Sequence, residues 1–400
     1  MTEIIRRTWA EIDLDALAHN YRQVRAAADP GAMVCCVVKA DGYGHGAVRV
    51  SAELQGLGAD WFAVSNLEEA LQLRRGGITR PILVLGFTPP EEAAALAEED
   101  ISQCVYSADY AEKLSLCACA VGVKVKVHAK IDTGMSRLGF YFQDIFRDEE
   151  AIGQVIAACG LPGLIPEGVF SHFAVSDEGS GGDAFTMRQF GCFKELSEAL
   201  VRAGVGGDKP PLRHCANSAA VFDYPLSHLD MVRAGVVLYG LYPSEKLRAR
   251  PDLRPVLALR SVVSHVKTLQ PGATVSYGRE FTAEREMQVA TVPVGYADGY
   301  PRALSPGGAE VLIRGRRCPV LGRICMDQLM ADVTGLEGVA MGDRVTLIGR
   351  DGGEEISAAQ VAGWEDTISY EVVCALSKRV PRVYLKGGRV ESIYNQLLTE

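Results

Sequence analysis

A lysine stands where an apolar segment ends, in the stretch VVKADGYGHGA at residues 37–47. The apolar residues 33–38 stop at Lys39, and a loop rich in glycine follows. A lysine amine that is partly desolvated has a depressed pKa, so it can attack an aldehyde and form a Schiff base. The glycines do not fit the GxGxxG spacing of a dinucleotide site. The alternative is that Lys39 is an ordinary surface lysine.

Two later stretches, CANSAA and VRAGVVLYG, could bind a phosphate group. Asn217 and Ser218 would begin a short helix, whose free N–H groups bind anions and for which serine is a good N-cap. Gly235 follows another apolar run. Each stretch alone is explained as well by helix capping or a turn glycine. A lysine together with two anion sites, without metal-ligand spacing, favours pyridoxal phosphate as the cofactor.

Positioning these groups requires strands that end at one rim, and the first part of the chain predicts them. Short apolar runs alternate with helical patterns at 33–38, 61–65, 82–86, 103–106, 123–131, 167–172, 211–215 and 230–237. This alternation, after an opening helix expected over 11–28, predicts a (β/α)8 barrel, with a doubly wound sheet as the rival. Chemistry in such barrels lies at the C-terminal ends of the strands. Those ends carry Lys39, Arg137, His172, Asn217, Ser218 and Arg233.

The pattern changes after about residue 245. Strand-like runs such as VLALRSVVSHVKTL, MQVATVPV, AEVLIRG and RVTLIG are separated there by Pro-Gly, Gly-Gly and Gly-Asp turns. They predict a mostly-β second domain. Residues 242–255, rich in proline and charge, are the expected linker. We therefore expect a barrel domain over 1–245 and a β-rich domain over 246–400.

Composition excludes several classes of protein. The 400 residues carry a net charge of −9 without a basic block, so a nucleic-acid partner is not expected. No apolar stretch is long enough for a membrane helix, and the N-terminus lacks an apolar signal core. Eleven cysteines, several in apolar runs and none in a CxxC pair, indicate reduced thiols in the cytoplasm. No metal site is expected.

Further motifs extend the pattern over nearly the whole chain. VVKADGYGHG is followed, in this order, by KIDTGMSRLGF, FSHFA, ANSAA, VSYGREF, PVGYADGYPR, ICMDQ and ISYEV. The sequence resembles the bacterial alanine racemases. That resemblance implies an N-terminal (β/α)8 barrel followed by a β-rich domain, pyridoxal phosphate as cofactor, and a head-to-tail homodimer with shared active sites. The implied activity interconverts L-alanine and D-alanine, which bacteria use in the cell wall.

The resemblance also implies roles for particular residues. Lys39 corresponds to the lysine that holds the cofactor aldehyde, and Arg233 to the arginine that faces its pyridine nitrogen. Arg137 corresponds to the arginine near the phenolic oxygen and the substrate carboxylate. Tyr277 corresponds to a second catalytic base given by the other subunit. The positions that hold the cofactor phosphate are Tyr43, Ser218, Gly235, Val236 and Tyr370.

Other positions follow from the same resemblance. Met326 and Asp327 correspond to residues on the substrate side. Lys130 corresponds to a lysine that is carbamylated in some relatives, and the sequence leaves its state here open. Two positions depart from the common pattern: Ser136 stands where glycine is common and Ala234 where proline is common.

Racemisation requires a base on each face of the α-carbon, a role for which Lys39 and Tyr277 are suited. A phenol has a pKa near 10, so ionising it at pH 7 costs about 4 kcal/mol. His172 and Arg233 are expected to help through hydrogen bonds and positive charge. A guanidinium does not lose its proton, so the pyridine nitrogen facing Arg233 should stay an acceptor.

Three other functions compete with alanine racemisation. One is a racemase for serine or for a broader range of amino acids on the same fold. Another is a non-catalytic pyridoxal-phosphate protein, which the VSYGREF and ICMDQ motifs of the second domain disfavour. The third is a decarboxylase, disfavoured because none of the matched positions supplies an acidic partner for the pyridine nitrogen.

Overall fold

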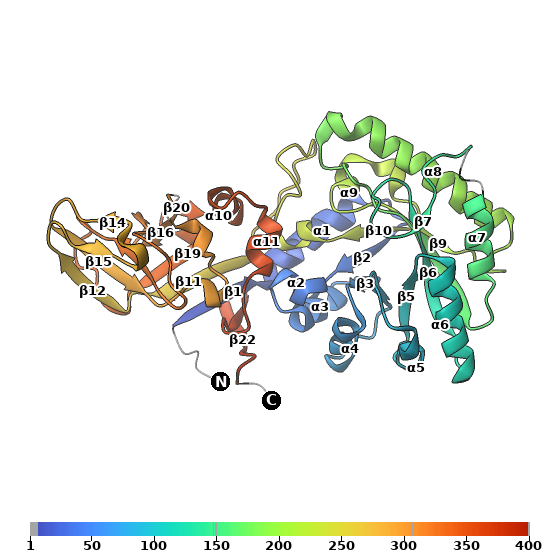
Figure 1. Ribbon diagram of the computed structural model, residues 1–400, viewed down its shortest axis with the longest axis horizontal. Helices are drawn as coiled ribbons and strands as arrows, with labels where there is room; N and C mark the ends of the chain where they lie inside the picture. The colour runs from blue at the N-terminus through green and yellow to red at the C-terminus, as the bar shows by residue number, and fades with distance from the viewer. Residues whose placement is uncertain (1–6, 147, 149, 306–307, 399–400) are drawn as a thin grey trace. The chain divides into compact units, whose positions relative to one another are not determined.

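The computed structural model describes residues 7–146, 148, 150–305 and 308–398 (Figure 1). Contacts between residues divide it into two compact units. The barrel unit comprises residues 18–42 and 47–253, and the β-rich unit comprises residues 7–17, 43–46 and 254–398.

The barrel unit is built on parallel strands in the order β10-β2-β3-β4-β5-β6-β8-β9. They are β2 (Met33–Val37), β3 (Trp61–Val64), β4 (Ile82–Val84), β5 (Ile101–Val105), β6 (Val125–Asp132), β8 (Leu164–Phe170), β9 (Leu212–His214) and β10 (Met231–Ala234). Each overlaps one predicted run, so the predicted barrel is confirmed. The runs are rich in apolar residues because helices cover the outer face of the strands while side chains fill the interior.

Helices lie along the outside of these strands (Figure 1). They are α1 (Leu14–Ala27), α3 (Ala47–Gly56), α4 (Leu67–Arg75), α5 (Ala93–Glu98), α6 (Ala108–Ala120), α7 (Glu150–Cys159), α8 (Asp183–Arg202) and α9 (Ala220–Asp223). A short strand, β7 (Phe140–Tyr141), pairs with the end of β6. Ser107 begins α6 by accepting a 3.2 Å hydrogen bond from the N–H of Tyr110, as N-cap residues do.

The last gap in the barrel lies between β9 and β10, which share few contacts and no strand ladder among the described residues. Backbone bonds and an ion pair bridge it. The N–H and Nε of Arg213 both donate to Oδ2 of Asp230, at 2.8 and 2.9 Å. The N–H of Asp230 donates to the carbonyl of Arg213 at 3.1 Å, and the N–H of Arg233 donates to the carbonyl of Ala216 at 3.0 Å. The barrel is therefore nearly closed, with an ion pair adding to a few backbone bonds at this gap.

The β-rich unit contains a sheet in the order β17-β16-β19-β11-β1-β21-β22, with β20 beside β19. Its strands are β1 (Thr8–Asp13), β11 (Leu257–Val262), β16 (Glu310–Ile313), β17 (Arg316–Pro319), β19 (Arg344–Asp351), β20 (Glu354–Ile356), β21 (Arg382–Lys386) and β22 (Arg389–Tyr394). The predicted mostly-β character of this part of the chain is confirmed.

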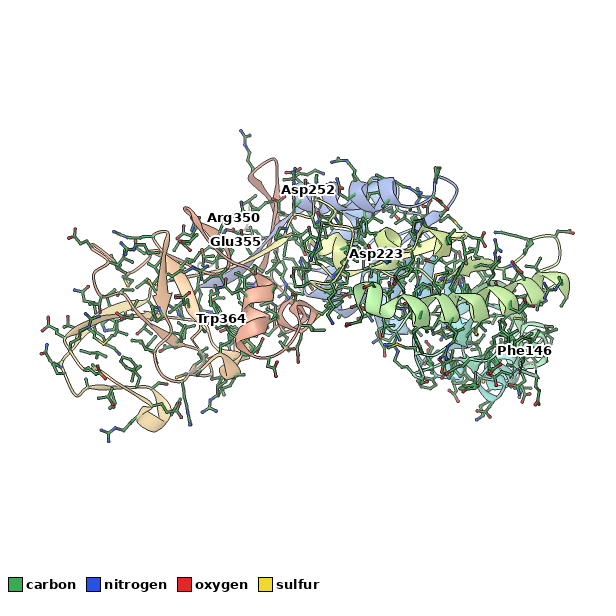
Figure 2. All side chains as sticks on the ribbon, turned by 90° about the horizontal axis from the view of Figure 1, so that it is seen from above. Phe146, Asp223, Asp252, Arg350, Glu355 and Trp364 are labelled. Atoms are coloured by element: carbon green, nitrogen blue, oxygen red, sulfur yellow. The ribbon has the colours of Figure 1, made fainter. Side chains whose placement is uncertain are left out.

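Smaller elements complete this unit. A three-stranded sheet joins β12 (His265–Leu269), β15 (Met287–Val292) and β18 (Leu329–Asp332), and a hairpin pairs β13 (Thr274–Val275) with β14 (Phe281–Thr282). Two helices, α10 (Ala358–Trp364) and α11 (Ser369–Cys374), follow β20. Arg350 and Glu355 lie opposite each other on β19 and β20 and form a 2.6 Å ion pair (Figure 2).

The N-terminal segment departs from our expectation. The opening helix begins at Leu14, not at residue 11, because Glu11–Asp13 belong to β1. Strand β1 lies between β11, to which it is antiparallel, and β21, to which it is parallel. The first described residues thus belong to the β-rich unit, whereas we expected them in the barrel domain. The boundary near residue 245 itself stays a prediction.

The expected linker, 242–255, contains no helix or strand. Asp223 of the barrel unit holds its middle part: the carboxylate accepts from the N–H groups of Arg248 and Ala249, at 3.0 and 2.8 Å (Figure 2). In the described residues, no helix has the length and apolarity to cross a bilayer, and no cluster of three metal-ligating side chains occurs. All eleven cysteines lie in the described ranges and are free thiols.

Candidate active site

Lys39 begins a tight left-handed turn, where the sequence had indicated a loose loop. In α2 (Lys39–Tyr43), the residues Ala40, Asp41 and Gly42 have φ angles of 53, 52 and 61° with positive ψ. The left-handed conformation costs an L-residue about 1–2 kcal/mol, so two of these three residues are strained. The chain thereby turns immediately after β2 and leaves the half-buried Lys39 at the strand end.

Side chains around the turn hold this strained backbone. The carboxylate of Asp41 accepts a 2.9 Å hydrogen bond from the N–H of Ala47, at the start of α3. The carboxylate of Glu69 accepts a 2.7 Å bond from the N–H of Ala40. Backbone strain of this kind persists only where surrounding contacts over-determine it, and it is common at functional sites.

Tyr43 and Gly44, which end this turn, pack within the β-rich unit. The rings of Tyr43 and Tyr370 lie 6.1 Å apart between centroids. A Cβ added at Gly44, whose φ is +80°, would lie 2.0 Å from the carbonyl oxygen of Val373. Only glycine permits this approach. The glycines of the DGYGHG stretch thus bring Tyr43 beside Tyr370, two residues expected near the cofactor phosphate.

Replacing Gly44 by alanine is expected to lower the free energy of unfolding by about 3 kcal/mol, through backbone strain and steric overlap together. Gly77 is a matched control, because its φ is +82° and nothing lies within 4 Å of its added Cβ. Gly77→Ala should therefore cost only the strain, about 1 kcal/mol. Urea unfolding of both variants measures the difference, and equal losses would contradict the proposed overlap.

The residues that we expect to bind an anion lie on neighbouring strand ends of the barrel. The N–H of Gly235 donates a 2.8 Å hydrogen bond to Oγ of Ser218, which is buried. Gly235 precedes the 3-10 helix η4 (Val236–Tyr239). Strand β10 pairs in parallel with β2, so the Gly235 end adjoins the strand end that leads to Lys39.

Ser218 is not the helix cap that the sequence suggested. Oδ1 of Asn217 accepts from the N–H of Ala220, at 3.1 Å, and so caps the short helix α9. The hydroxyl of Ser218 instead links the segment after β9 to the segment after β10. The helix α9 has only four residues, so the N–H groups at its start form a weak anion site by themselves. The segments after β9 and β10, joined by Ser218, are the better candidate.

Arg233 is 4% exposed and is bound on several sides. Its Nη1 donates to Nδ1 and to the carbonyl of His214, both at 2.9 Å. Its Nη2 donates to the carbonyl of Ser171 at 2.7 Å and lies 3.4 Å from Nδ1 of His172. Its guanidinium carbon lies 5.4 Å from the centre of the Phe170 ring. These contacts fix the orientation of the buried cation.

His172 is buried beside cationic groups. Burial, followed by the charges of Arg233 and Lys130, holds the pKa of His172 well below its usual range. These surroundings favour the neutral imidazole, which can still donate and accept hydrogen bonds. The expected help of His172 to Tyr277 stays a prediction.

Lys130 is a buried amine whose Nζ has no hydrogen-bond partner among the described residues. It lies 5.0 Å from the centre of the Phe170 ring. Burial first, then the charges of Arg233 and Arg137, lower the pKa of Lys130 from 10.5 to about 7. A neutral buried amine near Arg137 has the reactivity that carbamylation requires, since the free base is the nucleophile.

The lowered pKa of Lys130 should make the free energy of unfolding depend on pH. The unfolded chain binds this proton up to about pH 10.5 and the folded barrel releases it near pH 7, so stability rises with pH between these values. Replacing Lys130 by methionine should remove up to about 1.4 kcal/mol of this rise per pH unit. Urea unfolding in buffer free of CO₂ measures the slope. Identical slopes in the wild type and the variant would contradict a depressed pKa.

Ser136 and Arg137 follow β6. Ser136 has a φ of 54°, which accounts for glycine being common at this position in the family it resembles. The N–H of Ser136 donates to Oδ1 of Asp132 at 2.9 Å. Arg137 is exposed. The carboxylate of Asp132 therefore holds the strained turn that presents Arg137.

Tyr277 lies at the exposed tip of the β13–β14 hairpin, with 67% of its surface accessible. Oγ of Ser276 donates to the carbonyl of Arg323 at 2.5 Å and lies 3.4 Å from Sγ of Cys325. The guanidinium of Arg323 forms an ion pair with Glu280 on the other side of the tip. The tip is therefore held from both sides by the segment that leads to Met326.

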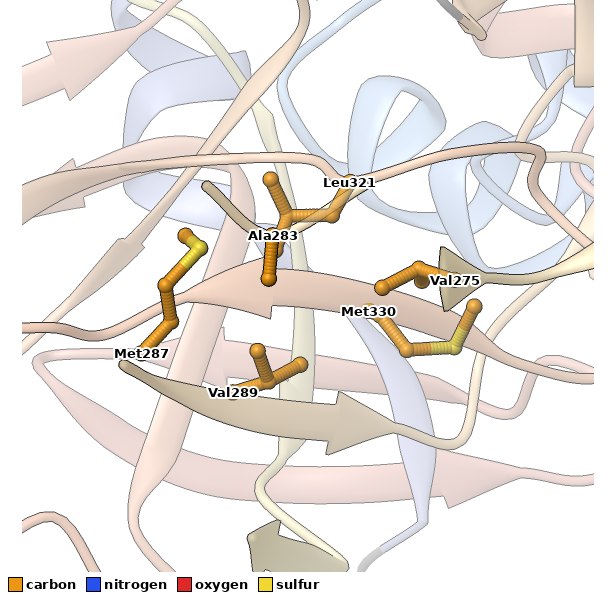
Figure 3. Close-up of a cluster of buried hydrophobic side chains, with 6 residues drawn as sticks. All are labelled: Val275, Ala283, Met287, Val289, Leu321 and Met330. Carbon is orange, nitrogen blue, oxygen red and sulfur yellow. The ribbon is translucent and has the colours of Figure 1, made fainter. Parts of the chain in front are cut away.

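A buried cluster anchors the base of this hairpin (Figure 3). Its members come from the hairpin, from β15 and β18 and from the segment before Arg323: Val275, Ala283, Met287, Val289, Leu321 and Met330. Close packing of such side chains anchors the hairpin and so fixes the position of its tip. A side chain that is to accept or donate a proton has to be held in place in this way.

Met326 is 52% exposed, and its backbone is held by a tight turn. The N–H of Ala297 donates to the carbonyl of Met326 at 3.0 Å, and a Cβ at Gly295 would lie 2.5 Å from that oxygen. Next to it, Asp327 accepts a 2.7 Å bond from Arg379. The structure thus places Met326 and Tyr277 on linked segments of the β-rich unit.

The predicted site residues fall into two sets, one in each unit. The barrel unit carries Lys39, Lys130, Arg137, His172, Ser218, Arg233, Gly235 and Val236, and the β-rich unit carries Tyr43, Tyr277, Met326, Asp327 and Tyr370. Sequence reasoning did not identify His214 and His128, which connect to Arg233 inside the barrel. Their signal was a histidine inside a predicted strand, beside other polar residues such as Lys130 and Arg213.

The barrel residues fit pyridoxal phosphate by the chemistry of their donors. Lys39 offers an amine at the end of β2, and the adjoining strand β10 ends in the Gly235–Ser218 contact, where an anion can bind. Arg233 is a buried cation with a fixed orientation. The amine of Lys39 suits the aldehyde of the cofactor, the Gly235–Ser218 contact suits its phosphate, and Arg233 suits its ring nitrogen.

Comparisons with known proteins agree over almost the whole chain. The family profile of the alanine racemase N-terminal domain matches residues 12–243, and that of the alanine racemase C-terminal domain matches residues 256–384. The alanine racemase of Desulfovibrio desulfuricans is 47% identical over 386 residues, which is 96% of this chain and all of the relative.

Solved structures give the same result. An alanine racemase from Clostridium difficile has a TM-score of 0.92 at 40% identity, covering 99% of this chain and 100% of its own. A histidine racemase from Leuconostoc mesenteroides has a TM-score of 0.84 at 27% identity, covering 96% of this chain and 99% of its own. The similarity therefore extends through both units, and the chain belongs to the alanine racemase family of isomerases.

Proposed function

We propose that the protein interconverts L-alanine and D-alanine with pyridoxal 5′-phosphate, using Lys39 and Tyr277 as bases on opposite faces of the α-carbon. The observation that carries this proposal is Lys39 at the end of β2, beside the anion site at the end of β10. When bound, the cofactor supplies an electron sink that acidifies the α-proton of an amino acid. The remaining chemistry is that of the chain itself.

Each group of the barrel unit has a stated part in this proposal. The amine of Lys39 would hold the cofactor aldehyde and would move the α-proton on its own face of the substrate. Ser218, Gly235 and Val236 would hold the phosphate, a role also proposed for Tyr43 and Tyr370. Arg233 would bind the ring nitrogen and keep it an acceptor, because a guanidinium only donates.

The second face requires Tyr277, which we propose comes from a second copy of the chain in a homodimer. Its exposed position on an anchored hairpin supports this assignment. Arg137 would bind the substrate carboxylate, and Met326 would limit the room for the substrate side chain. This restriction would favour alanine, whose side chain is a single methyl group. D-Alanine would then be supplied for cell-wall synthesis in the cytoplasm.

A second candidate is a racemase for other amino acids, which the structural likeness to a histidine racemase favours. The fold alone therefore does not set the substrate. We expect the purified protein to be yellow with pyridoxal phosphate, and to racemise L-alanine well above L-serine, L-lysine and L-histidine in a chiral assay. A protein that gains no colour, or that prefers a larger amino acid, would contradict the proposal.

A further inference from the structure

A line of polar side chains crosses the barrel interior from Arg233 to Glu167. Nη1 of Arg233 lies 2.9 Å from Nδ1 of His214, and Nε2 of His214 lies 2.8 Å from Nδ1 of His128. Nε2 of His128 lies 3.4 Å from Oε2 of Glu167. Oγ of Ser102 donates to the same oxygen at 2.5 Å.

The two ends of this line lie at different depths in the barrel. His214 ends β9 and pairs with Phe170 at the end of β8, near the rim that carries the cofactor residues. Glu167 is the middle residue of β8 and is partly exposed, and Ser102 lies near the start of β5. Both histidines between them are fully buried. The line thus runs from the rim at the strand ends down to the middle of β8, where Ser102 meets Glu167.

Only one arrangement of protons satisfies every contact in this line. A guanidinium only donates, so Nδ1 of His214 must accept and its proton must lie on Nε2. That proton points at Nδ1 of His128, which must also accept, so His128 carries its own proton on Nε2. The proton of His128 then faces the carboxylate of Glu167, which only accepts.

Charge and burial agree with this arrangement. Burial lowers the pKa of both His214 and His128, so each ring is neutral and holds one proton. Burial raises the pKa of Glu167, but its interactions with His128 and Ser102 outweigh this and lower it, which leaves an ionised carboxylate. Among the described residues, the buried Nε2 of His128 has no partner at full hydrogen-bond geometry, and the carboxylate oxygen Oε2 of Glu167 lies 3.4 Å from it.

The fold makes room for the line at a specific place. Gly168, beside Glu167 on β8, pairs with His128 on β6. A Cβ added at Gly168 would lie 2.2 Å from Nδ1 of His128. The absence of a side chain there allows the imidazole to lie flat against β8, where its two nitrogens reach His214 and Glu167.

We infer that Glu167 is a positioning residue for Arg233: its carboxylate fixes the tautomers of His128 and His214, so that Nδ1 of His214 always presents a lone pair to the guanidinium. If His128 carried its proton on Nδ1, two N–H groups would face each other at His214. The reversal would pass along the line and place an N–H against Arg233. The link from Arg233 to the cofactor rests on the proposed function, whereas the tautomers do not.

The direct test is nitrogen NMR of the holoenzyme labelled with ¹⁵N-histidine, in which ring signals report the protonated nitrogen. Variants His128→Asn and His214→Asn assign the two signals by their loss. We expect both rings of the wild type to be neutral and protonated on Nε2. A wild-type His214 protonated on Nδ1, or a doubly protonated ring, would overturn the inference without any variant at Glu167.

Two substitutions at Glu167 then separate the acceptor from the charge. Glu167→Gln keeps an oxygen that accepts from His128, and should keep both tautomers and nearly all activity. Glu167→Met removes the acceptor; both ring signals should become mixtures of tautomers, and kcat should fall by about 10- to 100-fold with little change in KM. Exposed Glu112→Met is the control. Unchanged tautomers in Glu167→Met would refute the role of Glu167, even if the protein proves to have a different substrate.

Discussion

Replacing Lys39 by alanine is expected to lower racemisation of alanine by at least about 10³-fold in both directions. Lys39 is proposed to bind the cofactor and to serve as one base, so its loss removes two functions that do not compensate for each other. Lys39→Arg is the matched variant, since it keeps the positive charge but lacks an amine that can be deprotonated. Both variants should be equally inactive.

Chemical labelling makes this prediction sharper, because the barrel contains a competing amine. Lys130 is buried with a pKa of about 7, which also makes it a nucleophile at neutral pH. Borohydride reduction in the presence of pyridoxal phosphate should leave a permanent pyridoxyl group on Lys39 and none on Lys130. Peptide mapping by mass spectrometry locates the label. A label on Lys130, or on no lysine, would refute the assignment.

Replacing Tyr277 by phenylalanine is expected to lower kcat for racemisation by about 10²- to 10⁴-fold, the range for loss of a general acid or base. The ring remains and only the hydroxyl is lost, so the packing of the hairpin should not change. Tyr141→Phe, which removes a hydroxyl from another exposed tyrosine, is the control and should be fully active.

The two-base scheme also predicts an asymmetry that simple damage to the site would not produce. In Tyr277→Phe, the base on the other face is intact, so one enantiomer of alanine should still exchange its α-proton with deuterated water. The opposite enantiomer should exchange far more slowly. Equal exchange from both enantiomers, or undiminished racemisation, would show that one base serves both faces.

Short runs rich in apolar residues, alternating with helical patterns, allowed the barrel to be predicted, because each parallel strand is largely buried whatever its exact partner. Strand β1 could not be predicted in this way. Its residues Glu11–Asp13 continue smoothly into the helical spacing of α1. What makes them a strand is pairing with residues 257–261 and 382–385, which no local pattern contains.

In the candidate site, too, some features could be predicted from the local sequence and others could not. Lys39 and Ser218 could be predicted because each follows an apolar run and carries a distinctive group. The left-handed turn after Lys39 could not, since three of its four left-handed residues, Ala40, Asp41 and Tyr43, are not glycine and favour other conformations in isolation. The line from Arg233 to Glu167 was missed because a histidine within a buried strand is usually a satisfied core residue.

The central position of β1 in its sheet has a consequence for synthesis on the ribosome. Its partner β21 begins at Arg382, so at about 5–20 residues per second the strand waits roughly 20–70 s for that partner to be made. During this time its apolar face and unpaired backbone are open to chaperones or to other nascent chains. A shortened protein meant to isolate the barrel should therefore begin after Asp13, because the first strand would otherwise remain permanently without neighbours.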